Sequence, residues 1–307
     1  MGISRGIVYI TTIAAAIVTI IIIIFSPVYY NHNIIGLARP PPALAQSIPD
    51  DNGVIMYYYP SLQHSVYNPL ILASGGLSYF TEYQDRGDSQ SKEHFINTAN
   101  WLFNNAKDKE QGRYSIWEYD FTWPWYGGIT PPYYSAYTQA VGIVVLAHAY
   151  NLTGNPAYID KAHKAFQALL VDYDSGGATT SEDHGKSLFF HELAKPGFEK
   201  AYILNGHTGA LLHIWQYYEL TQDPQAKIIF DKGINYLKHH LRKYDTGSWS
   251  LYDQTVSHHR KTNLATEHYH KIHIDHLKEL YSITGEPILK KYADRFTKYL
   301  NNRNGLL

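Results

Sequence analysis

One seven-residue turn occurs three times and decides the fold of this chain: Tyr150-Asn-Leu-Thr-Gly-Asn-Pro156, Tyr218-Glu-Leu-Thr-Gln-Asp-Pro224 and Tyr281-Ser-Ile-Thr-Gly-Glu-Pro287. Each copy follows an apolar-periodic segment typical of a helix and precedes another. The residues after the Thr end one helix, and the Pro stands at or near the start of the next. A looser version, Tyr83-Gln-Asp-Arg-Gly-Asp88, precedes the helix expected around residues 94–104. The spacings from Tyr83 are 67, 68 and 63 residues, which predicts a repeated helical hairpin.

Each repeat also carries a short segment rich in Gly and aromatic residues. The segments Tyr114 to Phe121, Ser187 to Leu193 and Gly247 to Tyr252 alternate with period two, which predicts strands. We expect them at the mouth of the helical bundle, where one hairpin passes to the next. The predicted fold is therefore mainly α, an α/α toroid built as an incomplete barrel of about four helical hairpins. Short strands lie at its cleft, and Glu192 and Tyr252 are expected at the same end.

The N-terminal residues predict a membrane anchor. The run from Ile7 to Phe25 has no charge, and a helix of this length approaches the roughly 30 Å hydrocarbon core of a bilayer. Arg5 precedes the run and no Lys or Arg follows until Arg39, so the bulk of the chain is expected outside the cytoplasm. A cleaved signal is the alternative, because Ala43-Leu-Ala45 resembles a signal-peptidase site. The expected organisation is a cytoplasmic N-terminus (1–6), a single transmembrane anchor (7–25), a Pro-containing linker (26–52) and one α/α-toroid domain (53–307).

Composition narrows the function only slightly. The net charge is −1, so nothing favours nucleic acid as a partner. The absence of cysteine excludes disulfides and thiolate metal sites. The 28 tyrosines and 6 tryptophans suit stacking on sugar rings, although tyrosine-rich helical repeats also pack with tyrosine.

Several short motifs together resemble the C-terminal domain of the D-glucuronyl C5-epimerases. They are Phe190-His-Glu-Leu193, Ile203-Leu-Asn-Gly206, Tyr252-Asp-Gln254, Asn263-Leu-Ala265 and Tyr269-His-Lys-Ile-His-Ile274. The resemblance is good from Tyr133 to Leu300 and weak from about Pro60. It implies an isomerase that inverts C5 of D-glucuronate residues within a polysaccharide.

Inversion at C5 removes a carbon-bound proton beside a carboxylate and returns one to the other face. This needs a base on one face, an acid on the other, and donors for the charge that develops on the carboxylate. By the resemblance, Glu192 is the carboxylate of the acid/base pair and Tyr269 is the opposing group. Tyr252 is the phenol that polarises the site.

The resemblance also implies a set of substrate-binding residues. His270 and His273 share a helix face and are expected to hold the uronate carboxylate or to orient Tyr269. The remaining positions expected to line the cleft are Asn205, Asn263, Tyr134, Gln139 and Arg260.

Two positions depart from the family pattern. Leu193 stands where the family has the second Tyr of Tyr-Glu-Glu-Tyr, and Thr255 replaces an Arg suited to clamping a carboxylate. Arg260 lies in the same loop and is the candidate substitute. These changes leave the proton-transfer pair in place and leave the identity of the substrate open.

Three other functions remain open at this point. A polysaccharide lyase begins with the same proton removal at C5. A non-catalytic glycan-binding module on the same fold is favoured by Leu193 and Thr255. An inverting glycosidase would need a second carboxylate, for which Glu118, Asp120 and Asp253 are the candidates.

Neither a metal nor an organic cofactor is expected. His270, His273 and His276 are the histidines that come nearest to a metal-binding pattern, but steps of three spread them around a helix. No Gly-rich phosphate loop occurs. The expected partners are a uronate-containing polysaccharide, the membrane through the N-terminal helix, and a second copy of the chain as a possible homodimer.

Overall fold

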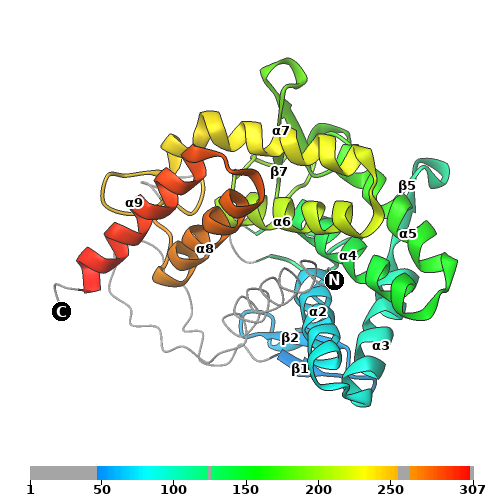
Figure 1. The fold of residues 1–307 in the computed structure, drawn as a ribbon. Coiled ribbons are helices and arrows are strands. Elements are labelled where there is room, and N and C mark those ends of the chain that lie inside the picture. Colours follow the sequence, from blue (N-terminus) through cyan, green and yellow to red (C-terminus); the bar gives the residue numbers. More distant parts are fainter. Residues whose placement is uncertain (1–46, 124–125, 127, 255–262, 305–307) are drawn as a thin grey trace, which may run out of the picture. The chain divides into compact units, whose positions relative to one another are not determined.

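The computed structural model describes residues 47–123, 126, 128–254 and 263–304. The chain forms two compact units (Figure 1). The first consists of residues up to 104 together with 123–128, and the second of residues 105–122 and 129 onward.

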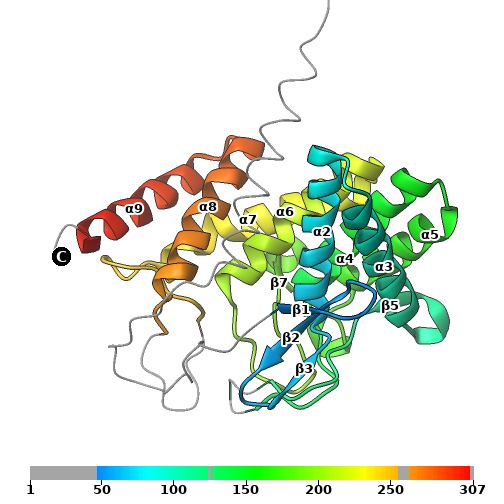
Figure 2. The same cartoon turned by 90° about the horizontal axis from the view of Figure 1, so that it is seen from below.

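The first unit combines a small sheet with one helical hairpin. The antiparallel strands β1 (Ser47–Pro49), β2 (Ile55–Tyr59) and β3 (His64–Val66) lie in that order, and β2 packs on a helix (Figure 2). The hairpin consists of α2 (Pro69–Arg86) and α3 (Ser89–Asn105). Strand β1 falls inside the segment predicted as linker, so secondary structure starts before residue 53.

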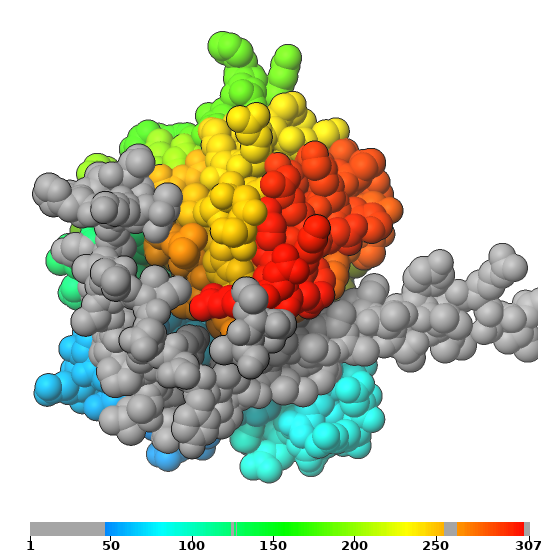
Figure 3. Space-filling model, turned by 90° about the vertical axis from the view of Figure 1, so that its left-hand side faces the viewer, coloured from blue at the N-terminus to red at the C-terminus, as the bar shows by residue number. Residues whose placement is uncertain are grey.

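The second unit contains three helical hairpins. These are α4 (Ala136–Thr153) with α5 (Pro156–Phe166), α6 (Leu204–Thr221) with α7 (Pro224–His240), and α8 (Glu267–Thr284) with α9 (Pro287–Asn304). The first helices of the hairpins form a row in which α4 packs on α6 and α6 packs on α8, and each second helix packs on its own partner. Figure 3 shows α9 beside α7 on one face of this unit. Helix α4 is apolar nearly all round and is accordingly buried.

The repeated turn ends α2, α4, α6 and α8 in the same way. At each end the N–H of the C-cap residue donates to the carbonyl of the repeat tyrosine, at 2.7–2.8 Å. The C-cap residues have left-handed backbones, with φ of 69°, 70°, 55° and 68° at Gly87, Gly154, Gln222 and Gly285. Glycine suits three of these positions because a Cβ is disfavoured there. The predicted class and the four hairpins are confirmed in the part of the chain that the structure describes.

Hydrogen bonds also explain why threonine recurs in the turn. In the last three copies its hydroxyl donates to the carbonyl four residues earlier, at 2.6–2.7 Å. The same oxygen accepts from the N–H two residues later, at 3.2–3.3 Å. The hydroxyl thus bridges the end of one helix and the start of the next, where a proline occupies the first position.

Two of the three predicted strands form, each over only the first part of the predicted segment. β5 (Tyr114–Ile116) pairs with β4 (Lys107–Lys109), and β7 (Ser187–Phe190) pairs with β6 (Thr179–Glu182), each as an antiparallel hairpin. The third segment, 247–252, makes only isolated bridges. The Thr246 hydroxyl accepts from the N–H groups of Ser248 and Trp249, and this side-chain turn competes with a regular ladder.

The predicted transmembrane anchor lies outside the described residues. Among the helices of residues 47–304 that the structure describes, none is long and apolar enough to span a membrane.

Candidate active site

The segments that lead into α4, α6 and α8 are joined by backbone hydrogen bonds. Tyr134 and Ala194 exchange a pair at 2.8 and 2.9 Å, and the Ala136 N–H donates to His191 O at 2.8 Å. The N–H of Leu204, the first residue of α6, donates to Tyr252 O at 3.0 Å. The three helix starts therefore lie together at one end of the row. Their partial positive charges favour a negative group there.

The expected carboxylate, Glu192, lies among these helix starts. It follows β7, and Asn205 Nδ2 donates to its Oε2 at 3.0 Å. Burial raises the pKa of Glu192 to about 7, and the bond from Asn205 opposes part of that rise. A carboxyl with this pKa exchanges protons readily near neutral pH.

Gly206 explains why Glu192 can approach α6 so closely. A Cβ at Gly206 would lie 2.4 Å from Glu192 Cβ and 2.6 Å from its Oε2. The Asn-Gly pair at the start of α6 therefore acts on one target: Asn205 binds the carboxylate and Gly206 leaves room for it. The Asn205 Oδ1 atom is buried and has no hydrogen-bond partner among the described residues, so it remains available to a ligand hydroxyl.

The two expected phenols meet beside the start of α6. The rings of Tyr252 and Tyr269 lie 4.7 Å apart between centroids, tilted by 56°. Both backbone polar groups of Tyr252 are bonded, the N–H to Asn263 O at 2.7 Å and the carbonyl to Leu204. Tyr269 stands in the first turn of α8, which Thr266 caps. Glu192 and Tyr252 therefore lie at the same end, both beside the start of α6, as predicted.

Asn263 fastens the segment that carries Tyr252. Its Nδ2 donates to Asp253 Oδ2 at 2.8 Å, and Asp253 is buried. Asn263 is thus beside the site and is engaged within the chain. Arg260, the predicted substitute clamp, lies outside the described residues.

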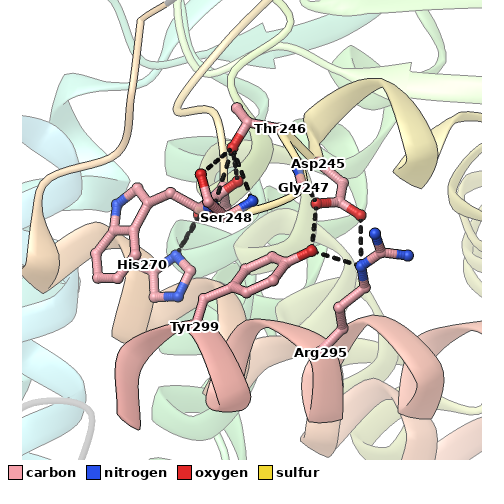
Figure 4. Close-up of polar contacts among 9 residues, drawn as sticks. Asp245, Thr246, Gly247, Ser248, His270, Arg295 and Tyr299 are labelled. Carbon is pink, nitrogen blue, oxygen red and sulfur yellow. Dashed lines mark hydrogen bonds and ion pairs between the residues drawn. The ribbon is translucent and has the colours of Figure 1, made fainter. Parts of the chain in front are cut away.

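A polar network ties the turn before Tyr252 to α9 (Figure 4). Arg295 Nε donates to Asp245 Oδ2 at 2.9 Å, and Tyr299 Oη donates to Asp245 Oδ1 at 3.0 Å. The Gly247 N–H donates to the same Oδ1 at 2.9 Å. The Asp245 side chain is only 5% exposed, so these donors are its main compensation for lost hydration.

His270 and His273 secure the same turn to α8. His270 Nε2 lies 2.9 Å from Phe296 O, and a carbonyl only accepts, so this nitrogen carries the proton. His270 Nδ1 then accepts from Ser250 Oγ at 2.7 Å, which leaves that oxygen to accept from His273 Nδ1 at 2.9 Å. Trp249 stacks on His270 at 3.7 Å.

This placement gives the two histidines a structural role. Both are fully buried, and burial lowers the pKa of each ring, so both stay neutral at pH 7. Three of their four ring nitrogens hold the turn before Tyr252 or α9, and His273 Nε2 is buried without a hydrogen-bond partner among the described residues. His276, the third histidine of the helix, bonds Thr208 on α6 at 2.9 Å. Among the described residues no group of three or more His, Asp or Glu is arranged to hold a metal.

Gln139 is also structural. It is 1% exposed, accepts from Trp117 N–H at 2.8 Å, and donates to Ser115 O and Ala165 O at 3.2 and 3.1 Å. These bonds fasten β5 and α5 to α4. The predicted contact of Gln139 with substrate is therefore not supported.

Tyr134 precedes α4 and lies near an ion pair. Its backbone pairs with Ala194, and burial raises its pKa, with smaller effects of Lys109 and Glu118. Lys109 and Glu118 form an ion pair at 2.5 Å. Glu118 is therefore engaged, Asp120 is exposed and Asp253 is held by Asn263, so none is placed as the second carboxylate of an inverting glycosidase.

The structure adds one residue that the sequence interpretation missed. Tyr137 stands in the first turn of α4, and its ring fits against Gly209 of α6. Burial raises its pKa, followed by the negative charges of Glu192, Glu279 and Tyr269. Its position in the block from Tyr133 to Gln139 was the available signal, but the gap at Gly209 is visible only in the fold.

Solved structures share the fold of this chain. A glycoside hydrolase of family 105 from C. acetobutylicum matches with a TM-score of 0.52 and 14% identity, covering 76% of this chain and 63% of that one. The unsaturated glucuronyl hydrolase of Bacillus sp. GL1 matches with a TM-score of 0.52 and 12% identity, covering 76% and 61%. At this level of identity the likeness concerns the fold, which is the mainly helical α/α-toroid type.

The family follows from sequence comparison. A family described as D-glucuronyl C5-epimerase C-terminus matches residues 110–298, and the chain belongs to this family. The D-glucuronyl C5-epimerase of Caenorhabditis elegans is 29% identical over 227 residues, which are 68% of this chain and 35% of that protein. An uncharacterised protein of Methanocaldococcus jannaschii is 28% identical over 189 residues, 62% of this chain and 59% of that one. The chain thus spans less than two thirds of either relative.

Proposed function

We propose that this protein is an epimerase that inverts C5 of D-glucuronate residues within a polysaccharide. The observation that carries the proposal is a carboxyl with a pKa of about 7 placed near a pair of tyrosines at the joined starts of α4, α6 and α8. Family membership supplies the reaction class.

In the proposed reaction Glu192 and Tyr269 act on opposite faces of the uronate ring. Ionised Glu192 removes the C5 proton, and the C5–H electron pair moves toward the uronate carboxylate. The phenol of Tyr269 then donates a proton to the other face of C5. A carboxyl whose pKa is raised and a phenol are closer in pKa than their ordinary values would be, which favours transfer in both directions.

The charge that develops on the uronate carboxylate needs donors. The partial positive charges of the helix starts and the hydroxyl of Tyr252 supply them in this proposal. The buried Asn205 Oδ1 would accept from a sugar hydroxyl and so orient the ring beside Glu192. Each of these groups belongs to the second unit.

The N-terminal prediction becomes part of the same proposal. We propose that residues 7–25 anchor the chain in a membrane with the catalytic domain on the extracytoplasmic side. A fusion of residues 1–52 to a reporter enzyme that is active only outside the cytoplasm tests this orientation. Reporter activity in the soluble fraction alone would contradict the anchor.

The test of the activity is deuterium incorporation at C5 when the full-length chain meets glucuronate-containing polysaccharides in D₂O. Wild type is compared with Glu192→Gln and Tyr269→Phe. The matched control is Tyr217→Phe, which alters a buried tyrosine of α6 stacked on Phe166. Exchange in wild type and control, lost in both site variants, is the expected result.

The products separate the remaining alternatives. An inverted C5 without new ultraviolet absorbance supports epimerisation, whereas an unsaturated, absorbing product would identify a lyase. Binding of the polysaccharide without any exchange in wild type would contradict both and leave a glycan-binding module.

A further inference from the structure

Tyr137 and Glu192 occupy neighbouring gaps on one face of α6. A Cβ at Gly209 would lie 2.4 Å from Cζ of Tyr137, the carbon that bears the hydroxyl. A Cβ at Gly206 would lie 2.6 Å from Oε2 of Glu192. Residues three apart on a helix share a face with Cβ positions about 5–6 Å apart. The phenol of Tyr137 is therefore near the carboxylate, about one helical turn along α6.

The backbone holds the two residues in this relation. The Ala136 N–H donates to His191 O at 2.8 Å, and Tyr137 and Glu192 are the next residues on the two segments. Two backbone hydrogen bonds between Tyr134 and Ala194 join the same two segments a few residues away. The juxtaposition thus belongs to the framework and does not depend on a flexible loop.

The phenol pair of the site approaches the same part of α6. The N–H of Leu204, the first residue of α6, donates to Tyr252 O at 3.0 Å, and the rings of Tyr252 and Tyr269 lie 4.7 Å apart between centroids. The ring of Tyr137 lies 5.7 Å from that of His213, and burial, followed by the negative charges of Glu192, Glu279 and Tyr269, raises the pKa of Tyr137. Burial lowers the pKa of His213, so that ring is neutral at pH 7. Together these surroundings keep Tyr137 in its phenol form beside Glu192, near the start of α6.

A two-sided epimerase must restore its protons after each turnover. Once Glu192 has taken the C5 proton and Tyr269 has given one, the enzyme holds a carboxylic acid and a phenolate. The enzyme cannot repeat the reaction in the same direction until a proton passes from the carboxylic acid of Glu192 to the phenolate of Tyr269.

We propose that Tyr137 relays this proton from Glu192 to Tyr269. The inference rests on the proposed function. The Tyr137 oxygen accepts the carboxyl proton while its own hydroxyl proton passes to the Tyr269 phenolate. One O–H bond breaks at Glu192 and one forms at Tyr137; one breaks at Tyr137 and one forms at Tyr269. Tyr137 ends the step unchanged, and no other reactant is needed.

The test is the steady-state kinetics of Tyr137→Phe in the full-length chain. Phenylalanine keeps the ring against Gly209, so the fold is preserved and only the relay oxygen is lost. The return step follows product release, so it limits kcat and leaves kcat/KM unchanged. We expect kcat to fall about tenfold or more, KM to fall with it, and imidazole buffer to restore kcat by carrying the proton.

Two further variants make the outcome decisive. Tyr217→Phe should keep wild-type kcat, and Glu279→Gln should do the same because the relay does not pass through Glu279. An equal fall of kcat and kcat/KM in Tyr137→Phe would indicate a substrate contact or a structural role and would overturn the relay. A kcat loss in Glu279→Gln that Tyr137→Phe does not share would overturn it as well.

The relay and the proposed function fail in different ways. If Glu192→Gln and Tyr269→Phe abolish exchange while Tyr137→Phe keeps wild-type kcat, the proposed function stands and the relay is wrong. Absence of C5 exchange in wild type would contradict the proposed function itself and, with it, the relay.

Discussion

The carboxylate side and the phenol side of the candidate site are built differently. On the carboxylate side, Glu192 lies against Gly206 with one bond from Asn205, and burial raises its pKa. On the phenol side, a network that runs from α9 through Asp245 and Ser250 holds the turn before Tyr252. The first side is dominated by desolvation and the second by a hydrogen-bonded network, in which His273 Nε2 is the buried side-chain atom of the described residues left without a partner.

The difference reflects two tasks: one environment adjusts the pKa of Glu192, and the other holds the turn before Tyr252 in place. A group that exchanges protons benefits from an environment that leaves its charged form under-compensated, which lowers stability. A framework needs the opposite, because each buried donor or acceptor without a partner costs about 1–3 kcal/mol. Substitutions on the carboxylate side should therefore change activity more than stability, and those in the network should do the reverse.

The largest expected effect is on activity at Glu192. Glu192→Gln keeps the volume and the contact with Asn205 but removes the base. The rate of C5 exchange should fall by about 10³-fold, or about 4 kcal/mol in activation free energy. Deuterium exchange monitored by NMR measures it. A Gln variant that retains more than a tenth of wild-type exchange would contradict the assignment of Glu192.

The next effect is on stability at Asp245. Asp245→Ala leaves Arg295, Tyr299 and the Gly247 N–H without their acceptor, and we expect a loss of about 3 kcal/mol in the free energy of unfolding. Urea denaturation measures it. The control is Asp294→Ala on the exposed face of α9, expected to stay within about 0.5 kcal/mol. Equal effects of the two changes would show that the network does not hold the turn.

The pH dependence of stability sharpens the comparison on the carboxylate side. The pKa of Glu192 is about 7 in the folded chain, against an ordinary value of 4.5. Between these values the folded state binds more protons than the unfolded state, so this group lowers stability as the pH rises from about 4.5 to about 7. Glu192→Gln removes this pH-dependent loss of stability, because glutamine does not ionise.

The measurement is the stability difference between Glu192→Gln and wild type at several pH values. The variant should nearly match wild type near pH 4.5 and exceed it by about 3 kcal/mol at pH 7.5. Asp160, a carboxylate of α5, offers a control in Asp160→Asn. A difference that does not change with pH would mean that Glu192 is not desolvated.

The smallest effect is expected at Ser250. Ser250→Ala removes the hydroxyl that joins His270 and His273, and the free energy of unfolding should fall by about 1–2 kcal/mol. C5 exchange should fall less than tenfold, because Tyr252 is still held by Asn263 and Leu204. Ser282→Ala, at an exposed serine of α8, the helix that carries both histidines, is the control. A larger loss of activity than of stability would assign this network to the chemistry.

Local sequence predicted the repeat well and the site in part. The turns could be predicted because their hydrogen bonds join residues two to four apart, as between Gly154 and Tyr150. Gln139 and His270 were predicted to bind substrate, and the structure places them in the interior instead. A buried polar side chain and a ligand-binding one look alike in sequence, since both are polar residues in an apolar setting.

What the sequence determined by itself is the helical class, the hairpin repeat and the motifs that mark Glu192, Tyr252 and Tyr269. These follow from short-range interactions and from local patterns of residue type. Only the tertiary structure decided which polar residues face one another: that Gly206 admits Glu192, that Gly209 admits Tyr137, and that the histidines of α8 bond Ser250. Such contacts join residues from different repeats, and packing between helices selects them, so no local pattern contains them.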